Sequence, residues 1–162
     1  WGVVGEGDRR VGGAEGGGQA VRLSKGRGGA LCREERVAAG SKRFVVIIDE
    51  SKVMKKLGVG VLPVEVSGFL WRTTAHRLAT LATSLTVRGG EETPYITDNG
   101  NLILDLTLAD GIDNAPALAA ELKAMVGVVE HGLFIGLTDT CIVGGPDGPL
   151  VVGRQSGAAA SL

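Results

Sequence analysis

A glycine-rich turn flanked by cations is the first feature of this sequence that could do chemistry. Residues 25–29 read Lys-Gly-Arg-Gly-Gly and lead into a helix pattern. Glycines let backbone N–H groups approach an anion closely, the start of a helix adds a favourable dipole, and Lys25 and Arg27 add full charges. The turn matches neither the Walker A nor the GxGxxG pattern. We therefore expect an anion site here, with an ordinary surface turn as the alternative.

A carboxylate and a second lysine follow this turn closely in the sequence. Glu34 falls on the same face of the predicted helix as Leu31 and Ala38, where burial would raise its pKa toward a value useful for proton transfer. The alternative is an exposed glutamate that pairs within its helix. Lys52 follows the predicted strand Phe44–Ile48, and ligands of open α/β sheets gather outside the carboxyl ends of strands. Glu34 is thus a candidate proton carrier and Lys52 a candidate ligand-binding cation.

The composition argues against several classes of function. The chain of 162 residues has a net charge of −1 and 4% aromatic residues, so a nucleic-acid surface is not expected. Ten of its 17 Lys and Arg lie in residues 22–56, which favours a local anion site. Two distant cysteines and two histidines argue against a disulfide scaffold, a cysteine-rich zinc site and a multi-histidine metal centre. No apolar run is long enough to cross a membrane.

The elements that must position these residues follow from periodicity and turn signals. The apolar run Phe44–Ile48 predicts a strand buried on both faces of a parallel sheet, and Pro63 predicts that strand Leu62–Val66 lies at an edge. Residues 1–21 are rich in glycine and predict no regular element. The other predicted elements are a helix from Ser67 to about Ser84, a hairpin of Tyr95–Thr97 with Leu102–Leu106, a helix from Pro116 to about Met125, and strands Val128–Phe134, Cys141–Gly144 and Leu150–Val152.

From residue 62 onward this order is β-α-β-β-α-β, the split βαβ arrangement of a ferredoxin-like lobe. The remaining residues that could do chemistry are interpreted as structural. His76 and His131 are expected to be partly buried side chains, and Cys32 a helix-packing residue. Asp98 and Asn99 are expected to form a turn.

Five short motifs, in collinear order, resemble ribose-5-phosphate isomerase of the A type. They extend from about Leu23 to Val152, some four-fifths of the chain. In order they read Lys25-Gly26-x-Gly28-Gly29-Ala30-Leu31-x-Arg33-Glu34, Asp49-x-Ser51-Lys52, Leu62-Pro63-Val64-Glu65-Val66, Thr97-Asp98-Asn99-Gly100-Asn101-x-Ile103-Leu104-Asp105 and Gly127-Val128-Val129-Glu130-x-Gly132-Leu133-Phe134. Because five separate motifs occur in the right order, the resemblance is specific.

The resemblance implies an α/β fold, the remainder of an open Rossmann-like parallel sheet domain with an inserted ferredoxin-like α+β lobe. Residues 22–61 and 135–152 would form the partial catalytic domain, 62–134 the lobe, 1–21 an irregular start and 153–162 a disordered tail. It also implies interconversion of D-ribose 5-phosphate and D-ribulose 5-phosphate in the pentose phosphate pathway, with no metal and no organic cofactor. A homodimer is expected, in the cytoplasm or, for a plant or an alga, in a plastid.

Site residues follow from the resemblance position by position. Glu34 matches the base that takes the C2 proton of the open-chain aldose and returns it at C1. Lys25 matches the lysine that contacts the substrate and stabilises the enediolate oxygens. Lys52 matches the lysine that faces the sugar phosphate. The rest of the substrate-binding loop is formed by Gly26, Arg27 and Gly28.

The start of the chain departs from the family pattern. The family's Asp-Gly-Ala-Asp-Glu stretch falls, without gaps, on residues 12–16, so Gly13, Ala14 and Glu15 are only weak site candidates. The family's Thr-Gly-Ser-Thr phosphate loop has no match. We therefore expect an N-terminally incomplete or degenerate copy of the enzyme. The alternatives are a catalytically inactive sugar-phosphate-binding module and a structural remnant.

Overall fold

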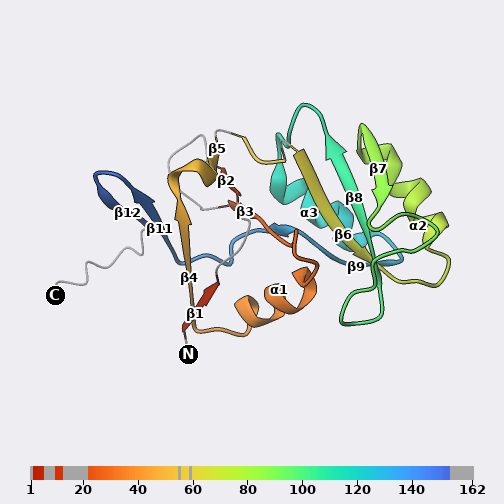
Figure 1. Ribbon diagram of the computed structural model, residues 1–162, viewed down its shortest axis with the longest axis horizontal. Helices are drawn as coiled ribbons and strands as arrows, with labels where there is room; N and C mark the ends of the chain where they lie inside the picture. The colour runs from red at the N-terminus through yellow and green to blue at the C-terminus, as the bar shows by residue number, and fades with distance from the viewer. Residues whose placement is uncertain (1, 6–9, 13–21, 55, 59, 154–162) are drawn as a thin grey trace.

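Three four-stranded sheets make up the framework of the molecule. The computed structural model describes residues 2–5, 10–12, 22–54, 56–58 and 60–153. Within these ranges the strand orders are β1-β4-β11-β12, β10-β3-β2-β5 and β7-β8-β6-β9 (Figure 1). Both parallel and antiparallel pairs occur. The predicted α/β class is therefore confirmed, with mixed sheets.

The first sheet is organised around β4 (Arg43–Asp49), which contains the predicted apolar strand. This strand lies between β1 (Gly2–Gly5) and β11 (Thr140–Gly145) and runs parallel to both. β12 (Gly148–Gly153) pairs antiparallel with β11 and forms the outer edge. The two final strands were expected from the sequence, and the structure confirms this hairpin.

Burial along β4 alternates, so the prediction of a strand buried on both faces is wrong. Phe44, Val46 and Ile48 are buried in one cluster with Phe134. Ile47, between them, is 45% exposed. Since successive side chains of a strand point to opposite faces, one face of β4 packs on the core and the other faces solvent.

Strands also form within residues 1–21, where none is predicted. β1 pairs with β4, and β2 (Arg10–Gly12) lies between β3 (Arg22–Ser24) and β5 (Val53–Met54). β10 (Leu133–Phe134) completes this second sheet beside β3. A ladder is made by backbone groups, so a glycine-rich segment without apolar periodicity can still join a sheet. The prediction of an irregular start is corrected at these two strands.

The third sheet is antiparallel throughout. Its strands are β6 (Gly60–Val66), β7 (Ser84–Val87), β8 (Leu102–Leu108) and β9 (Val128–His131). β6 lies between β8 and β9, so the prediction that Pro63 marks an edge strand is wrong. The Pro63 carbonyl accepts a hydrogen bond from Gly132 N–H at 2.9 Å. The nitrogen and the carbonyl oxygen of a strand residue point to the same side, so the Pro63 nitrogen also faces β9, where the pairing of β6 with β9 ends. The N–H that proline lacks is therefore not needed for a hydrogen bond to β8.

β7 takes the place of the strand predicted at Tyr95–Thr97. In that segment only an isolated bridge between Ile96 and Leu102 forms. The helix predicted to reach Ser84 ends much earlier: α2 spans Trp71–Leu78, and a 3₁₀ turn, η2 (Ala79–Leu81), follows it. The chain then pairs with β8. The helical spacing of a few apolar residues contains no information about this pairing.

The three α-helices of the described ranges begin in different ways. α3 (Ala115–Ala124) carries proline in its first turn as predicted, and the Asn114 side chain accepts a hydrogen bond from Ala117 N–H at 3.1 Å. α2 begins after Leu70, which has a φ of 54° and no side-chain cap, so the predicted cap at Ser67 is wrong. α1 (Leu31–Ala39) forms where it is predicted and contacts β9.

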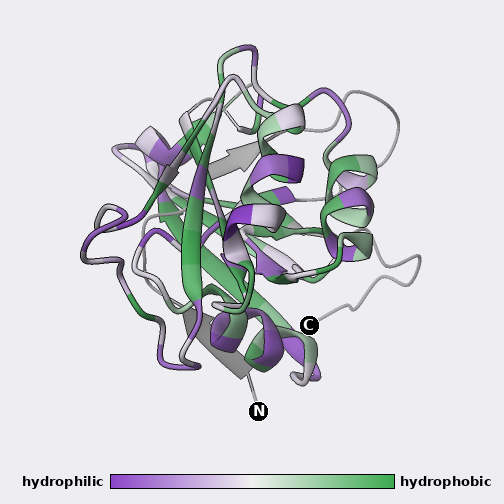
Figure 2. Cartoon of the chain, turned by 90° about the vertical axis from the view of Figure 1, so that its right-hand side faces the viewer, coloured by the Kyte–Doolittle hydropathy of each residue, from purple (hydrophilic) through white to green (hydrophobic). Residues whose placement is uncertain are grey.

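The main core lies between the third sheet and α2 and α3. Apolar side chains of β6 and β8 fill it together with Leu78 and Leu122 of the two helices. Figure 2 shows hydrophobic residues along the strands, and hydrophilic residues on the outer loops and on the helices. In the described part of the chain, no helix is long and apolar enough to cross a membrane. A smaller core surrounds β4 and supports β3, the strand that leads into the glycine turn.

Candidate functional site

The glycine turn lies between β3 and α1 and is fixed by its own backbone. Lys25 N–H donates to the Gly132 carbonyl at 2.8 Å, and Gly29 N–H donates to the Gly26 carbonyl at 3.0 Å. Gly26 and Gly29 have φ values of 95° and 92°, a region that favours glycine. A Cβ atom on Gly29 would lie 2.4 Å from the Tyr95 hydroxyl. The turn therefore requires glycine at both positions.

An arginine from the third sheet holds the same turn from outside. Arg88 donates to the carbonyls of Gly26 and Arg27, at 3.3 and 2.9 Å. Asp105 holds the guanidinium in turn through two bonds of 2.9 and 2.5 Å. Such a bidentate pair fixes the direction as well as the charge of the arginine. The carbonyls of the turn are thus occupied, while Gly28 has open space beside it.

Lys25 and Glu34 form the charged centre of the candidate site. The Lys25 Nζ lies 3.1 Å from Glu34 Oε2; the lysine side chain is 4% exposed and the glutamate side chain 36%. The same ammonium lies 5.8 and 5.1 Å from the ring centres of Phe44 and Phe134. Aromatic faces attract a cation and exclude water. A buried cation therefore stands beside a carboxylate that solvent, or a ligand, can reach.

The residue before this glutamate ties α1 to a distant loop. Arg33 donates to the Asp98 carbonyl at 2.8 Å and to Asn99 Oδ1 at 3.2 Å. Its Nη1 lies 3.3 Å from Asp98 Oδ2. Asp98 and Asn99 do form a turn, as the sequence predicts, and they also contact the helix that carries Glu34.

A buried carboxylate organises that loop. Glu65 is fully buried on β6, and its Oε1 accepts hydrogen bonds from Thr97 Oγ1, Asn99 Nδ2 and Asn101 Nδ2 at 3.0, 3.1 and 2.8 Å. A buried carboxylate is tolerated when donors compensate it. Because Asn99 also contacts Arg33, the third sheet is connected to α1 through this loop.

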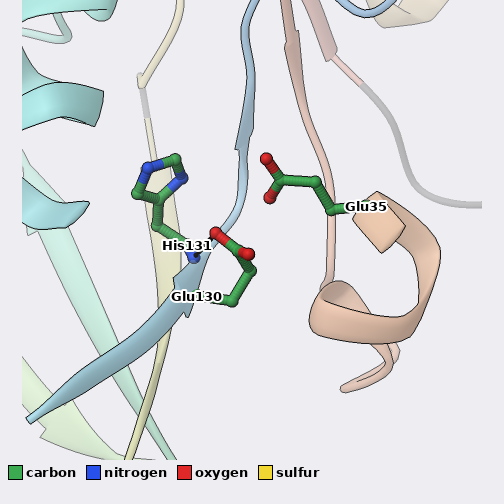
Figure 3. A group of neighbouring side chains, drawn as sticks. All are labelled: Glu35, Glu130 and His131. Carbon is green, nitrogen blue, oxygen red and sulfur yellow. Dashed lines mark hydrogen bonds between the residues drawn. The ribbon is translucent and has the colours of Figure 1, made fainter. Parts of the chain in front are cut away.

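A second polar cluster begins one residue further along α1. Glu35 faces Glu130 and His131 of β9, and their oxygen and nitrogen atoms lie within 4.8 Å of one another (Figure 3). Burial, together with the hydrogen bond and charge of Glu130, raises the pKa of Glu35 to about 8. Burial opposes ionisation of Glu130, but hydrogen bonds from Lys123 and Glu35 outweigh it and lower its pKa. Burial lowers the pKa of His131.

The other predicted site residues are distributed more widely. Lys52 ends the 3₁₀ turn η1 (Glu50–Lys52) that follows β4; Asp49 accepts hydrogen bonds from the Ser51 hydroxyl and N–H, which lower its pKa. Lys25 lies against Phe44 at the start of β4, whereas Lys52 follows its end, so the two lysines are separated along the strand. The role of Lys52 stays a prediction.

The weak candidates Gly13, Ala14 and Glu15 lie outside the described residues. Arg27 and Gly28, predicted to bind substrate, are exposed, and Gly26 is buried. Burial raises the pKa of the Cys32 thiol, which agrees with a packing role.

The residues that support this site lie far from it in the sequence. Arg88 is 62 residues from Gly26, and Glu65 is 34 residues from Asn99. Glu65 and Asp105 were noticed only as members of motifs. A charged residue inside an apolar strand is the one local signal that could have identified Glu65 as a buried, compensated group.

Comparison with known proteins places the chain in a family. Residues 4–148 match ribose 5-phosphate isomerase A (phosphoriboisomerase A). Ribose-5-phosphate isomerase A 1 of Oceanobacillus iheyensis is 48% identical over 125 residues, which cover 77% of this chain and 55% of the relative. The chain spans little more than half the length of the curated relatives it matches.

Solved structures give the same result. Ribose 5-phosphate isomerase A from Methanocaldococcus jannaschii superposes with a TM-score of 0.77 at 36% identity, covering 88% of this chain and 64% of that one. A D-ribose-5-phosphate isomerase in complex with phospho-erythronic acid gives 0.76 at 33% identity, covering 83% and 59%. From the matched residues and the shared fold together, we conclude that this chain belongs to the ribose 5-phosphate isomerase A family.

Proposed function

We propose that this chain carries the proton-transfer part of a site that interconverts D-ribose 5-phosphate and D-ribulose 5-phosphate. The observation that supports this most directly is the ion pair of Lys25 and Glu34 at 3.1 Å, with the carboxylate partly open to solvent. Membership of the isomerase family over residues 4–148 supports the reaction class. A solved relative binds phospho-erythronic acid, an acidic sugar phosphate, which is the class of ligand that a buried ammonium would hold.

Glu34 acts as the base in this proposal. Its carboxylate takes the proton from C2 of the open-chain aldose, and the electrons of that C–H bond form the C1–C2 double bond of an enediolate. The same carboxylate returns the proton to C1, while the hydroxyl proton on O2 moves to O1, which leaves the C2 ketone. One group can serve both carbons because they are adjacent, and a positioned acid–base group contributes roughly 10²- to 10⁴-fold to such a step.

Lys25 stabilises the negative charge that develops on the enediolate oxygens. Its ammonium is 4% exposed and is surrounded by two aromatic rings, so little water competes with a substrate oxygen for it. A fixed charge of this kind requires no reorganisation when the reaction occurs. The turn residues Gly26, Arg27 and Gly28 would line the substrate, and Lys52, at the carboxyl end of β4, would contact the phosphate.

The finer description of the fold belongs to the same proposal. The third sheet with α2 and α3 has the strand order and the β-α-β-β-α-β succession of a ferredoxin-like lobe. We assign it as a lobe inserted into a Rossmann-like sheet domain, of which β1, β4 and β11 supply the parallel strands. Assembly as a homodimer and a cytoplasmic location are predictions that follow from the resemblance.

The experiment that tests the reaction is a coupled assay for ribulose 5-phosphate formed from ribose 5-phosphate. We expect Glu34→Gln to lower turnover by about 10²- to 10⁴-fold. Glu121→Gln is the matched control, because Glu121 is exposed on α3 and should leave turnover unchanged. Equal turnover in the parent and Glu34→Gln would show that Glu34 is not the base.

A second candidate is a sugar-phosphate-binding module without turnover. It is favoured by one observation: in the register of the family's Asp-Gly-Ala-Asp-Glu stretch, the first aspartate and the final glutamate are replaced by glycine, at positions 12 and 16. Calorimetric binding of ribose 5-phosphate by a parent chain that gives no product would support the module. Turnover that depends on Glu34 would eliminate it.

A further inference from the structure

The cluster of Glu35, Glu130 and His131 has no part in the proton transfer and has its own geometry. Glu35 comes from α1, while Glu130 and His131 are consecutive on β9. Glu130 and His131 are 5% and 4% exposed. One oxygen of each carboxylate and one nitrogen of the ring lie within 4.8 Å of one another. Figure 3 shows the carboxyl groups of Glu35 and Glu130 near each other, with the His131 ring on the other side of the β9 ribbon.

The histidine ring is held in one orientation by α3. Its Nε2 lies 3.0 Å from the carbonyl oxygen of Ala119. A carbonyl oxygen only accepts hydrogen bonds, so Nε2 carries the hydrogen and Nδ1 carries a lone pair. This Nδ1 is buried and has no hydrogen-bond partner among the residues that the structure describes. In Figure 3 it is the ring nitrogen that faces the two carboxylates.

This orientation is the one that metal-binding histidines adopt. A ligating histidine typically donates its other ring N–H to a backbone carbonyl or a carboxylate, which fixes the tautomer and aims the lone pair. Here the Ala119 carbonyl has that role for His131. Glu35 Oε2 is also buried, and the carboxyl group of Glu35 shares a hydrogen bond with Glu130. A cation held by the Nδ1 lone pair would replace the proton of that hydrogen bond between the two carboxylates.

We propose that Glu35, Glu130 and His131 bind a divalent transition-metal cation of the zinc class. One imidazole nitrogen and two carboxylate oxygens form a mixed set that zinc accepts, with a fourth position for water. Magnesium and calcium are disfavoured because they select oxygen ligands. The site does not depend on the isomerase reaction. A cation bound there connects α1 to β9 through Glu35, the residue that follows Glu34.

Lys123 is the competing cation, and it provides a specific test. Its Nζ lies 2.5 Å from Glu130 Oε2, and its side chain is 55% exposed. The ammonium can therefore move into solvent when a metal binds, but it repels that metal while it stays. Removing its charge is expected to tighten metal binding, an effect that a purely structural cluster would not produce.

The experiment is a calorimetric titration of the full chain with zinc chloride, after treatment with a chelator and its removal. We expect saturation near one equivalent. Glu35→Gln should weaken zinc binding by at least about tenfold, the lower end of the loss seen even for outer partners of metal ligands. Glu121→Gln should bind zinc as the parent does, and Lys123→Gln should bind it several-fold more tightly.

Two further measurements keep the test decisive. Circular dichroism checks that each variant is folded; if Glu35→Gln is not, the tighter binding expected of Lys123→Gln carries the test alone. Cobalt(II) absorption separates a nitrogen–oxygen site from a thiolate site at either buried cysteine, Cys32 or Cys141. Absence of saturable zinc binding, equal binding by Glu35→Gln and the parent, or a thiolate spectrum would each overturn the proposal.

Discussion

Glu34 and Glu35 are consecutive on α1 but have opposite surroundings. Glu34 lies 3.1 Å from the buried ammonium of Lys25. Glu35 faces a second carboxylate, that of Glu130, and its pKa is raised to about 8 by burial and by this neighbour. Since residues of an α-helix are spaced 3.6 per turn, successive side chains leave the helix about 100° apart. One short helix thus directs two identical side chains into two different electrostatic sites.

The two sites also differ in how they are held. The Lys25 side is fixed by backbone hydrogen bonds to Gly132 and by the Arg88 contacts to the turn carbonyls. On the Glu35 side, the backbone contributes the N–H of His131, which donates to Glu130, and the Ala119 carbonyl, which contacts the His131 ring; the other contacts are between side chains. Under the proposed mechanism, the first site is preorganised for charge stabilisation; under the metal proposal, the second site binds a cation.

After the loss of Glu34 itself, the largest effect is expected from removing the cation beside it. Lys25→Met keeps the length and the apolar contacts with Phe44 and Phe134 but leaves the carboxylate without its ion pair. Under the proposed mechanism we expect turnover to fall by about 10²- to 10³-fold, the usual cost of losing one stabilising group at a developing oxyanion. The coupled assay measures it, with thermal unfolding as the check on folding. A loss smaller than threefold would contradict a direct role for Lys25.

An effect of intermediate size is expected from Glu35→Gln. In chelator-treated protein, this substitution should change how the free energy of unfolding depends on pH. The folded pKa of Glu35, about 8, lies above its ordinary value of 4.5. Its contribution to stability is therefore complete below pH 4.5 and is lost as the pH rises toward 8. The groups that face it are Glu130 and His131 of β9 and Lys123 of α3. The lowered pKa of Glu130 works in the opposite direction.

Glutamine cannot ionise, so the variant should escape this loss. We expect the free energy of unfolding of Glu35→Gln, relative to the parent, to increase by about 2 kcal/mol between pH 5 and pH 8. Urea unfolding at a series of pH values measures it, and Glu121→Gln, on the exposed face of α3, is the control. Parallel pH profiles for Glu35→Gln and the parent would show that Glu35 does not hold the proton.

The part of the fold that was predictable from the sequence is the part with a clear local pattern. α3 follows from its proline, α1 from its apolar face, and the β11–β12 hairpin from its turn residues. β7 is not evident from the sequence because Leu81 continues the helical spacing of Leu78 past the true end of α2. Pairing with β8 decides the structure there, and no short window contains that information.

The candidate site also contains residues that the sequence predicts and residues that it does not. Lys25 and Glu34 are nine residues apart and belong to one motif, and the structure places them in contact. Glu35 and Glu130 are 95 residues apart, and neither shows a local sign of the other. His131 was interpreted as a structural residue, since one histidine without a second cannot indicate a metal site from spacing. Only the packing of α1 on β9 brings these groups together.

The smallest effect is expected from Arg33, the residue that precedes Glu34 on α1. Its guanidinium connects α1 to Asp98 and Asn99, but the ion pair with Asp98 is exposed on both sides, at 57% and 62%. Exposed pairs contribute about 0.2–1 kcal/mol and are screened by salt. We therefore expect Arg33→Gln to lower the free energy of unfolding by about 1 kcal/mol at low salt and by less at high salt.

Arg33→Lys separates charge from geometry in this contact. Three different nitrogens of the guanidinium reach Asp98 Oδ2, the Asp98 carbonyl and Asn99 Oδ1, and a lysine ammonium cannot reproduce that fork. The lysine variant should recover only part of the stability in urea unfolding. Full recovery would mean that charge alone holds the loop. Asn99 is also hydrogen-bonded to the buried Glu65. Partial recovery would therefore indicate that directed hydrogen bonds of this loop link α1 to the third sheet. Such a link helps to keep Glu34 and Glu35 facing their different partners.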